Sequence, residues 1–332
     1  MTFQITIIGL GQIGASIGLA LQKHRDKFTR VGHDKNPDIS GKAKKLGAVD
    51  KVNINLPSSV RKADVVMLAI PADQVEETVK IIASDLKDGA VVLGTSPVTE
   101  GFFTLMKETL PAERHFVSFT PLINPLFLHD VEGGVDMADA RMFERGLIAI
   151  CAGRGTDGAA LKLASDLAEL IDAKPLFADP AEVDSYMTAT HLLPQLLAAA
   201  LAGSSTSQPG WSEGRKFAGR PFALVSSALA YCDKPGGIAT AAAMNQPHTL
   251  RVLDQAIAQL QEMRSEIAAQ DNQALNDRIQ HAYDGWARWW KERGRANWDD
   301  QEMGKFDPEA AKFNFLGGSL SRAIRNPGRD DD

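Results

Sequence analysis

The chain has 332 residues, of which 44% are hydrophobic and 23% charged, an ordinary composition for a globular protein long enough for two domains. Its formal net charge of −6 argues against binding to a nucleic-acid backbone, which favours a basic surface. Apolar runs fall short of the ~20 residues that cross a bilayer. The two cysteines, Cys151 and Cys232, lie far apart and indicate no disulfide framework or metal site. We therefore expect a soluble, cytoplasmic protein without a membrane or nucleic-acid partner.

The first half of the chain alternates short apolar runs with segments of helical spacing. The helices are expected at 13–22, at 74–83 with Asp73 as the N-cap, and at about 157–171. Apolar runs predict strands at 5–8, 29–32, 65–70, 90–93, 116–119 and 147–152. This alternation predicts an α/β fold with an N-terminal Rossmann-type, doubly wound and mostly parallel sheet.

The second half carries helical signals only, which predicts an all-helical domain. We place the nucleotide-binding domain at 1–176, the helical domain at 177–325 and a disordered tail at 326–332. A polar stretch at 203–220 is typical of a long loop. The expected helices span 180–202, 222–231, 248–269 and a segment from 272. One apolar stripe forms either core, the default interpretation, or a dimer seam: Leu250, Leu253, Ile257, Leu260, Met263 and Ile267.

A glycine motif, G-L-G-Q-I-G at residues 9–14, follows the first strand and opens a helix. In that context the first glycine permits a tight turn, the second lets the backbone approach a pyrophosphate, and the third allows close helix–strand packing. Asp34 follows Gly14 by 20 residues, where a carboxylate bonds a ribose 2′-hydroxyl. The predicted cofactor contacts are Gly9, Leu10, Gly11, Gln12, Ile13, Gly14, Asp34, Lys35, Ile70 and Pro71.

The acidic residue also predicts which dinucleotide binds. The Asp34 carboxylate repels a 2′-phosphate, so NAD is favoured over NADP, although the neighbouring Lys35 could soften that discrimination.

Beyond these motifs, the chain resembles the prephenate/arogenate dehydrogenases over most of its first 200 residues. The resemblance rests on I-I-G-L-G-Q-I-G-A-S-I-G-L-A-L (7–21), V-G-H-D-K-N-P (31–37), A-D-V-V-M-L-A-I-P (63–71), G-V-D-M-A-D-A-R-M-F-E-R-G (134–146) and D-P-A-E-V-D-S-Y-M-T-A-T-H-L-L-P (179–194). It implies a homodimer built mainly from the helical halves. The implied reaction is an oxidative decarboxylation with hydride transfer to NAD(P)⁺, in which a histidine accepts the proton of the ring hydroxyl and an arginine holds a carboxylate.

The substrate half departs from the family pattern. Thr120–Pro121 stands where the family's H-P-x-x-G motif carries the base histidine, and residues 236–242 lack the family's arginine. Ser96 survives from the D-x-x-S-x-K pattern, and His191 matches the first histidine of the SHLPH-containing helix. The resemblance thus implies His191, Ser96 and Thr120 as the catalytic candidates, acting on a small carboxylic acid.

Alternatives remain open for the missing groups and for the function. His129 could supply the base from a loop, and Arg215, Lys216 and Arg220 could replace the absent arginine. A non-catalytic NAD-binding sensor or scaffold would explain the lost residues. A 3-hydroxyacid or imine-type dehydrogenase is a further rival, although such enzymes place a lysine on the first long helix of the second domain and residues 180–202 contain none.

Overall fold

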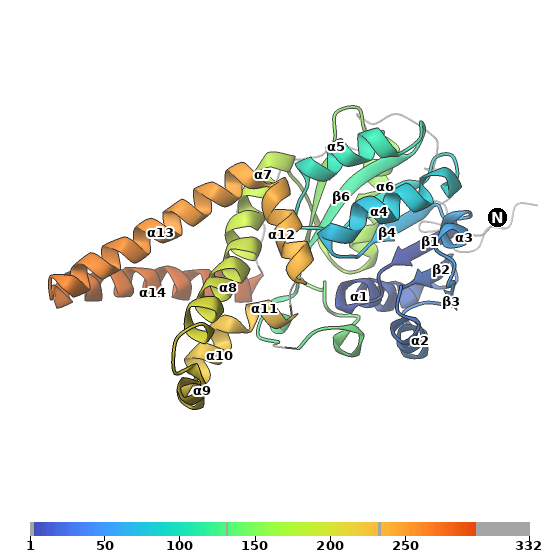
Figure 1. Ribbon diagram of the computed structural model, residues 1–332. Coiled ribbons are helices and arrows are strands. Elements are labelled where there is room, and N and C mark those ends of the chain that lie inside the picture. The colour runs from blue at the N-terminus through green and yellow to red at the C-terminus, as the bar shows by residue number, and fades with distance from the viewer. Residues whose placement is uncertain (1–2, 131, 232–233, 297–332) are drawn as a thin grey trace, which may run out of the picture.

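The computed structural model of the protein describes residues 3–130, 132–231 and 234–296, and its centre is one eight-stranded sheet (Figure 1). The strand order is β3-β2-β1-β4-β5-β6-β7-β8, and every neighbouring pair is parallel except β6 and β7. The strands are β1 (Phe3–Ile8), β2 (Phe28–His33), β3 (Lys51–Val52), β4 (Val65–Leu68), β5 (Val91–Gly94), β6 (His115–Leu122), β7 (Leu147–Ala152) and β8 (Lys174–Phe177). This confirms the doubly wound, mostly parallel sheet.

Helices cover both faces of the sheet. Such cover is expected, because the strands of a mostly parallel sheet carry apolar side chains on both faces. One face packs against α1 (Gln12–Ala20), α2 (Pro37–Leu46) and α6 (Gly158–Leu170). The other packs against α3 (Leu56–Val60), α4 (Ala72–Ile82) and α5 (Glu100–Thr109). Helices α2, α3 and α5 were not among the expected helices.

The rest of the described chain is helical. Helix α7 (Pro180–Met187), a π-turn η5 (Thr188–Leu192) and α8 (Leu193–Thr206) run on without interruption. Then follow α9 (Trp211–Gly214), α10 (Arg220–Ser226), α11 (Ala228–Tyr231), α12 (Pro235–Met244), α13 (Gln246–Ala268) and α14 (Asn272–Arg295). Among these, α12 packs on the sheet domain, where Ile238 and Ala241 join the core beneath α4 and α5.

Two local expectations are wrong. Asp73 does not cap α4, because Pro71 is the N-cap and Asp73 lies within the first helical turn. The stretch 203–220 is largely helical rather than a loop, since α8 continues to Thr206 and α9 begins at Trp211. Small residues such as Gly203 and the serines after it are compatible with a helix end, so composition alone misleads there. The predicted tail at 326–332 lies outside the described residues, as does Cys232.

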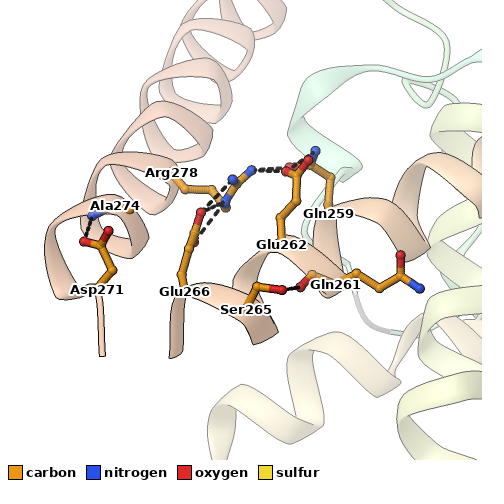
Figure 2. Close-up of polar contacts among 8 residues, drawn as sticks. All are labelled: Gln259, Gln261, Glu262, Ser265, Glu266, Asp271, Ala274 and Arg278. Atoms are coloured by element: carbon orange, nitrogen blue, oxygen red, sulfur yellow. Dashed lines mark hydrogen bonds and ion pairs between the residues drawn. The ribbon is translucent and has the colours of Figure 1, made fainter. Parts of the chain in front are cut away.

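Helices α13 and α14 form a long antiparallel hairpin that projects away from the sheet (Figure 1). Arg278 on α14 joins the two arms, with its guanidinium 2.6 Å from Glu262 and 2.7 Å from Glu266 (Figure 2). Asp271 caps α14 by accepting from the N–H of Ala274 at 2.9 Å. The hairpin is therefore a fixed element held by its own polar contacts.

The apolar stripe of α13 is not core in this chain, so the default interpretation is wrong. Leu250, Ile257, Leu260 and Ile267 are 50–62% exposed. The end of α14 returns to the sheet domain, where the ring of Trp290 lies 4.5 Å from that of His129, whereas the rest of the described hairpin projects away from the sheet (Figure 1). Among the described residues, no helix is both long enough and apolar enough to cross a membrane.

Candidate active site

The glycine turn after β1 gives each of its three glycines a different task. Gly9 has a φ of +89°, and a Cβ there would lie 2.2 Å from the carbonyl oxygen of Ala69. A Cβ on Gly14 would lie 1.9 Å from the carbonyl oxygen of Gly9. In contrast, a Cβ on Gly11 would meet nothing within 4 Å. Gly9 and Gly14 therefore serve the packing of the turn, whereas Gly11 keeps open the space in front of the N-terminus of α1.

Asp34 follows the end of β2 and lies next to this turn. Its Oδ2 accepts the N–H of Leu10 at 2.9 Å, and its Oδ1 accepts the N–H of Asn36 at 2.8 Å. A carboxylate offers about four acceptor positions, so the partly exposed group keeps capacity for a ribose hydroxyl. The two backbone bonds hold the carboxylate in a fixed orientation before any ligand binds.

The other predicted cofactor contacts surround the same turn. The Gln12 amide donates to the carbonyl of Met137 at 3.4 Å, and Ile13 packs on the core. Ile70 lies against Gly9, Pro71 starts α4, and Lys35 is exposed beside Asp34. An open helix N-terminus and an oriented carboxylate at the carboxyl ends of β1 and β2 fit the pyrophosphate and ribose of a dinucleotide.

Ser96 lies in the turn that follows β5, two strands away from the glycine turn. Its hydroxyl is buried and accepts the N–H of Val98 at 3.3 Å. The carbonyl of Ser96 accepts the hydroxyl of Thr120 at 3.1 Å. Thr120 is only 1% exposed and also contacts the hydroxyl of Ser118 at 3.2 Å. Thr120 is therefore placed to support the Ser96 turn from β6.

A residue that the sequence analysis overlooked, Asp184 on α7, adjoins this turn. It is 1% exposed, and its carboxylate accepts the N–H of Thr99 at 2.6 Å and that of Glu100 at 3.0 Å. Burial raises the pKa of the Asp184 carboxyl, and the hydrogen bonds from Glu100 and Thr99 oppose that rise. An acidic residue inside a helix is usually solvated, so no local signal in the sequence identified it.

His191 lies in the π-turn between α7 and α8. The N–H of Leu193 donates to the carbonyl of Thr188, five residues earlier, which is the widened turn of a π-helix. Pro194 accounts for it in part, because proline has no N–H for the usual bond four residues back. Leu192, the next residue after His191, is buried in the same cluster as Val98. The π-turn and the turn that carries Ser96 therefore contribute side chains to one apolar cluster.

Helix α12 spans the region where the family pattern predicts an arginine. A Cβ on Gly236 would lie 2.5 Å from a carboxylate oxygen of Asp73, and one on Gly237 would lie 3.3 Å from the Cβ of Pro71. The glycine pair thus lets the N-terminus of α12 approach the N-terminus of α4. Residues 235–244 contain no arginine, so this helix brings no guanidinium to the cofactor side of the site.

The alternative base, His129, and two of the alternative cationic residues, Arg215 and Lys216, have other neighbours. The ring of His129 lies 4.5 Å from that of Trp290 on α14, and this contact orients the histidine toward the hairpin. Arg215 and Lys216 are exposed, and Lys216 pairs with Glu213 at 2.5 Å. Within the described residues, no three His, Cys, Asp or Glu side chains are grouped as metal ligands. Burial raises the pKa of the Cys151 thiol to about 12, which keeps it protonated.

Comparison with known proteins assigns both halves to one family. The model of the prephenate dehydrogenase nucleotide-binding domain matches residues 17–176, and that of the prephenate dehydrogenase dimerization domain matches residues 179–281. A cyclohexadienyl dehydrogenase of Zymomonas mobilis is 25% identical over 273 residues, covering 82% of this chain and 90% of the relative. A prephenate dehydrogenase of Lactococcus lactis is 30% identical over 143 residues, covering 42% of this chain and 38% of the relative.

Solved structures share the fold. Prephenate dehydrogenase of Aquifex aeolicus, in complex with hydroxyphenyl propionate and NAD⁺, has 19% identity and a TM-score of 0.73, covering 87% of this chain and 98% of that one. Arogenate dehydrogenase of Synechocystis has 20% identity and a TM-score of 0.64, covering 86% of this chain and all of that one. Because the two family models together span most of the sequence, the chain belongs to the prephenate dehydrogenase family.

Proposed function

We propose that this protein is an NAD-dependent dehydrogenase that oxidises a small cyclohexadienyl carboxylic acid, the substrate class named for its relatives. The observation that supports the proposal is the glycine turn beside Asp34: a Cβ on Gly11 would meet nothing within 4 Å, and the Asp34 carboxylate is held by the N–H groups of Leu10 and Asn36. The oriented carboxylate favours NAD over NADP because it would repel a 2′-phosphate. When bound, the cofactor supplies the hydride acceptor.

The protein's own part in the reaction is to place the substrate and remove its hydroxyl proton. His191 is the proposed proton acceptor, because histidine is the most frequent general base and because its neighbour Leu192 belongs to the same apolar cluster as Val98 of the Ser96 turn. Ser96 is proposed to contact a substrate hydroxyl or carboxylate. Thr120, whose hydroxyl donates to Ser96, supports that turn rather than contacting substrate.

The role of His191 depends on how residues 190–195 are aligned with the family's SHLPH motif. Matching Thr190–His191 to the first two residues of SHLPH makes His191 the first histidine. Matching Leu193–Pro194 to its Leu-Pro pair instead places His191 at the serine and Gln195 at the second histidine. Gln195 is buried and donates to the carbonyl of His191 at 3.0 Å. In both registers His191 belongs to the motif.

An assay of hydride transfer tests the proposal. Purified protein, NAD⁺ and either prephenate or arogenate are mixed, and absorbance of the reduced nicotinamide is followed. We expect turnover with NAD⁺, a loss of at least 100-fold in kcat for His191→Ala, and loss of NAD binding for Gly11→Val. His248→Ala, which changes a histidine at the start of α13, is the matched control. Undiminished kcat in His191→Ala would remove its assigned role.

One observation favours a second function, an NAD-binding sensor or scaffold. The strand end that should carry the family's base holds Thr120, which is 1% exposed and hydrogen-bonded to Ser96. Tight NAD binding in calorimetry, combined with no turnover of either acid by the wild-type protein, would favour the sensor. The dimerization-domain match and the exposed stripe of α13 support a homodimer for both functions.

A further inference from the structure

The two proposed substrate groups come from different halves of the chain, and one buried carboxylate connects them. Asp184, on the first helix after the sheet domain, accepts the N–H groups of Thr99 and Glu100 at 2.6 and 3.0 Å. These N–H groups form the start of α5, for which Thr99 is the N-cap residue but makes no side-chain cap bond. A helix of the sheet domain is thus capped from the helical half.

The helical half holds Asp184 just as firmly. Its carbonyl accepts the hydroxyl of Thr188 at 2.6 Å and the side-chain amide of Asn245 at 3.1 Å. Asn245 also donates to the Thr188 hydroxyl at 2.6 Å, and its own carbonyl accepts the hydroxyl of Thr249 at 2.9 Å. Asn245 lies at the junction of α12 and α13. Three helical segments therefore meet at Asp184, and a movement of any of them would be transmitted to it.

The sheet domain continues the connection to Ser96 through hydroxyl groups. The hydroxyls of Thr99 and Ser118 lie 3.5 Å apart, those of Ser118 and Thr120 lie 3.2 Å apart, and Thr120 donates to the carbonyl of Ser96 at 3.1 Å. The turn from Ser96 to Thr99 is thus held at its start by Thr120 and at its end by Asp184. All of these hydroxyls are buried, so water does not compete for the bonds.

We propose that Asp184 is the positioning residue that fixes Ser96 relative to His191. His191 follows Asp184 by seven residues on the same continuous helix, about two turns. The carboxylate suits this position because it accepts two N–H groups and lies at the positive end of the α5 dipole. The assignment of a reaction to this geometry rests on the proposed dehydrogenase function, whereas the connection between the domains does not.

The test compares Asp184→Asn with the wild-type protein, both saturated with NAD⁺. Asparagine has nearly the same shape but replaces one acceptor oxygen with an NH₂ group, which cannot accept the second N–H. We expect amide hydrogen exchange at Thr99 and Glu100 to become at least 10-fold faster. We expect kcat to fall at least 10-fold while the Kd of NAD⁺ stays within twofold, because the glycine turn lies on other strands. Asp184→Glu, which keeps both acceptors, should recover part of kcat.

Asp179→Asn is the matched control, because Asp179 also caps a helix but caps its own, accepting the N–H of Ala181 at 2.9 Å on the exposed start of α7. It should change none of these quantities more than twofold. If Asp184→Asn does not fold, Asn245→Ala loosens the same junction from the other side and should give the same pattern at smaller size.

Two results would overturn the proposal. One is a folded Asp184→Asn protein whose exchange at Thr99 and Glu100 and whose kcat are both within twofold of wild type. The other is a loss of NAD⁺ affinity as large as the loss of kcat, since that would indicate general loosening. If the wild-type protein turns over neither acid, the proposed function fails. Amide hydrogen exchange at Thr99 and Glu100, together with the affinity for NAD⁺, then still decides whether Asp184 fixes the turn.

Discussion

Asp34 shows how much of the cofactor preference can reside in one side chain. Its carboxylate is already hydrogen-bonded to Leu10 and Asn36, so it need not reorient when a ribose arrives. A preoriented acceptor loses little conformational entropy on binding, which favours affinity. We propose that the same charge repels a phosphate on that ribose, so that this one group favours NAD over NADP.

The first prediction concerns this charge. Asp34→Asn should weaken NAD⁺ binding about 10-fold, because a hydrogen bond to a charged group is worth about 1.5–3 kcal/mol. Binding of NADP⁺ should change less or improve, since the repulsion is gone, and the ratio of the two Kd values from calorimetry measures the effect. Asp38→Asn, an exposed acidic residue four positions later, is the control. An unchanged ratio would show that discrimination lies elsewhere.

Ser96 and Thr120 show a different relation between residue and site. Ser96 follows the end of β5, whereas Thr120 lies inside β6, paired with Ala149, and its hydroxyl donates to the carbonyl of Ser96. The residue types could not reveal which way the Thr120 hydroxyl points, and the catalytic roles of both residues stay predictions. The Thr120 hydroxyl also lies 3.2 Å from that of Ser118, which in turn lies 3.5 Å from that of Thr99, a residue 19 positions away in the sequence.

At the scale of elements, Arg30 joins β2 to its neighbouring helices. Its guanidinium is 2% exposed, bonds Asp50 at 2.6 Å, and donates to the carbonyl of Gly18 on α1 at 2.7 Å. Burial tends to raise the pKa of the Asp50 carboxyl, but the hydrogen bonds and charge of Arg30 outweigh it and lower the pKa below its ordinary value of 3.8. The ion pair therefore stabilises the nucleotide-binding half while Asp50 is ionised.

The second prediction is the pH dependence that follows. Because the folded-state pKa lies below the unfolded one, the stabilisation is complete above about pH 4 and is lost as the pH falls through the folded-state pKa. Asp50→Asn should lower the free energy of unfolding by about 1–3 kcal/mol at pH 7, and the difference from wild type should shrink in acid. Urea unfolding between pH 7 and pH 3 measures it. Asp38→Asn should give no such pH-dependent difference.

The elements show which features a sequence predicts and which it does not. Strand β4 was predictable because every side chain in it is apolar, and β1 because it ends in the apolar run from Ile5 to Ile8, interrupted only by Thr6. In contrast, β3 is two residues long and β8 begins with Lys-Pro. The second strand begins only one residue before its predicted start, at Phe28. The glycine turn was predictable because its geometry depends on local backbone demands. The Asp184 connection was not, because its partners lie 84 and 85 residues away.

The helical half shows the same limit. The stripe on α13 was visible as a helical repeat, but the repeat cannot say what covers it. Among the described residues, most of the hairpin projects away from the sheet (Figure 1). Leu250, Ile257, Leu260 and Ile267 of the stripe are exposed. Similarly, composition indicated a loop at 203–220, because serine and glycine are frequent both in loops and at helix ends.

At the scale of the whole molecule, the hairpin of α13 and α14 carries an exposed apolar face. Large apolar side chains from both arms are about half exposed, including Ile257 and Leu260 on α13 and Ile279 and Trp286 on α14. A water-exposed face of this kind is costly, because burying one large apolar side chain is worth about 1.5–3 kcal/mol. The Arg278 bonds to Glu262 and Glu266 keep the two arms in one geometry, so the face is formed before association (Figure 2).

The last prediction places this face in the proposed homodimer. The double variant Ile257→Glu and Leu260→Glu should be monomeric at concentrations at which the wild-type protein is dimeric, because two carboxylates would be buried without partners. Analytical ultracentrifugation measures the mass, and circular dichroism checks that the helices remain.

Ala258→Glu adds a charge at an exposed residue adjacent to Ile257 but about 100° round the helix, and it should disturb association less. A wild-type protein that sediments as a monomer at every concentration would contradict the dimer. A variant that stays dimeric would place the interface on another face of the helical half.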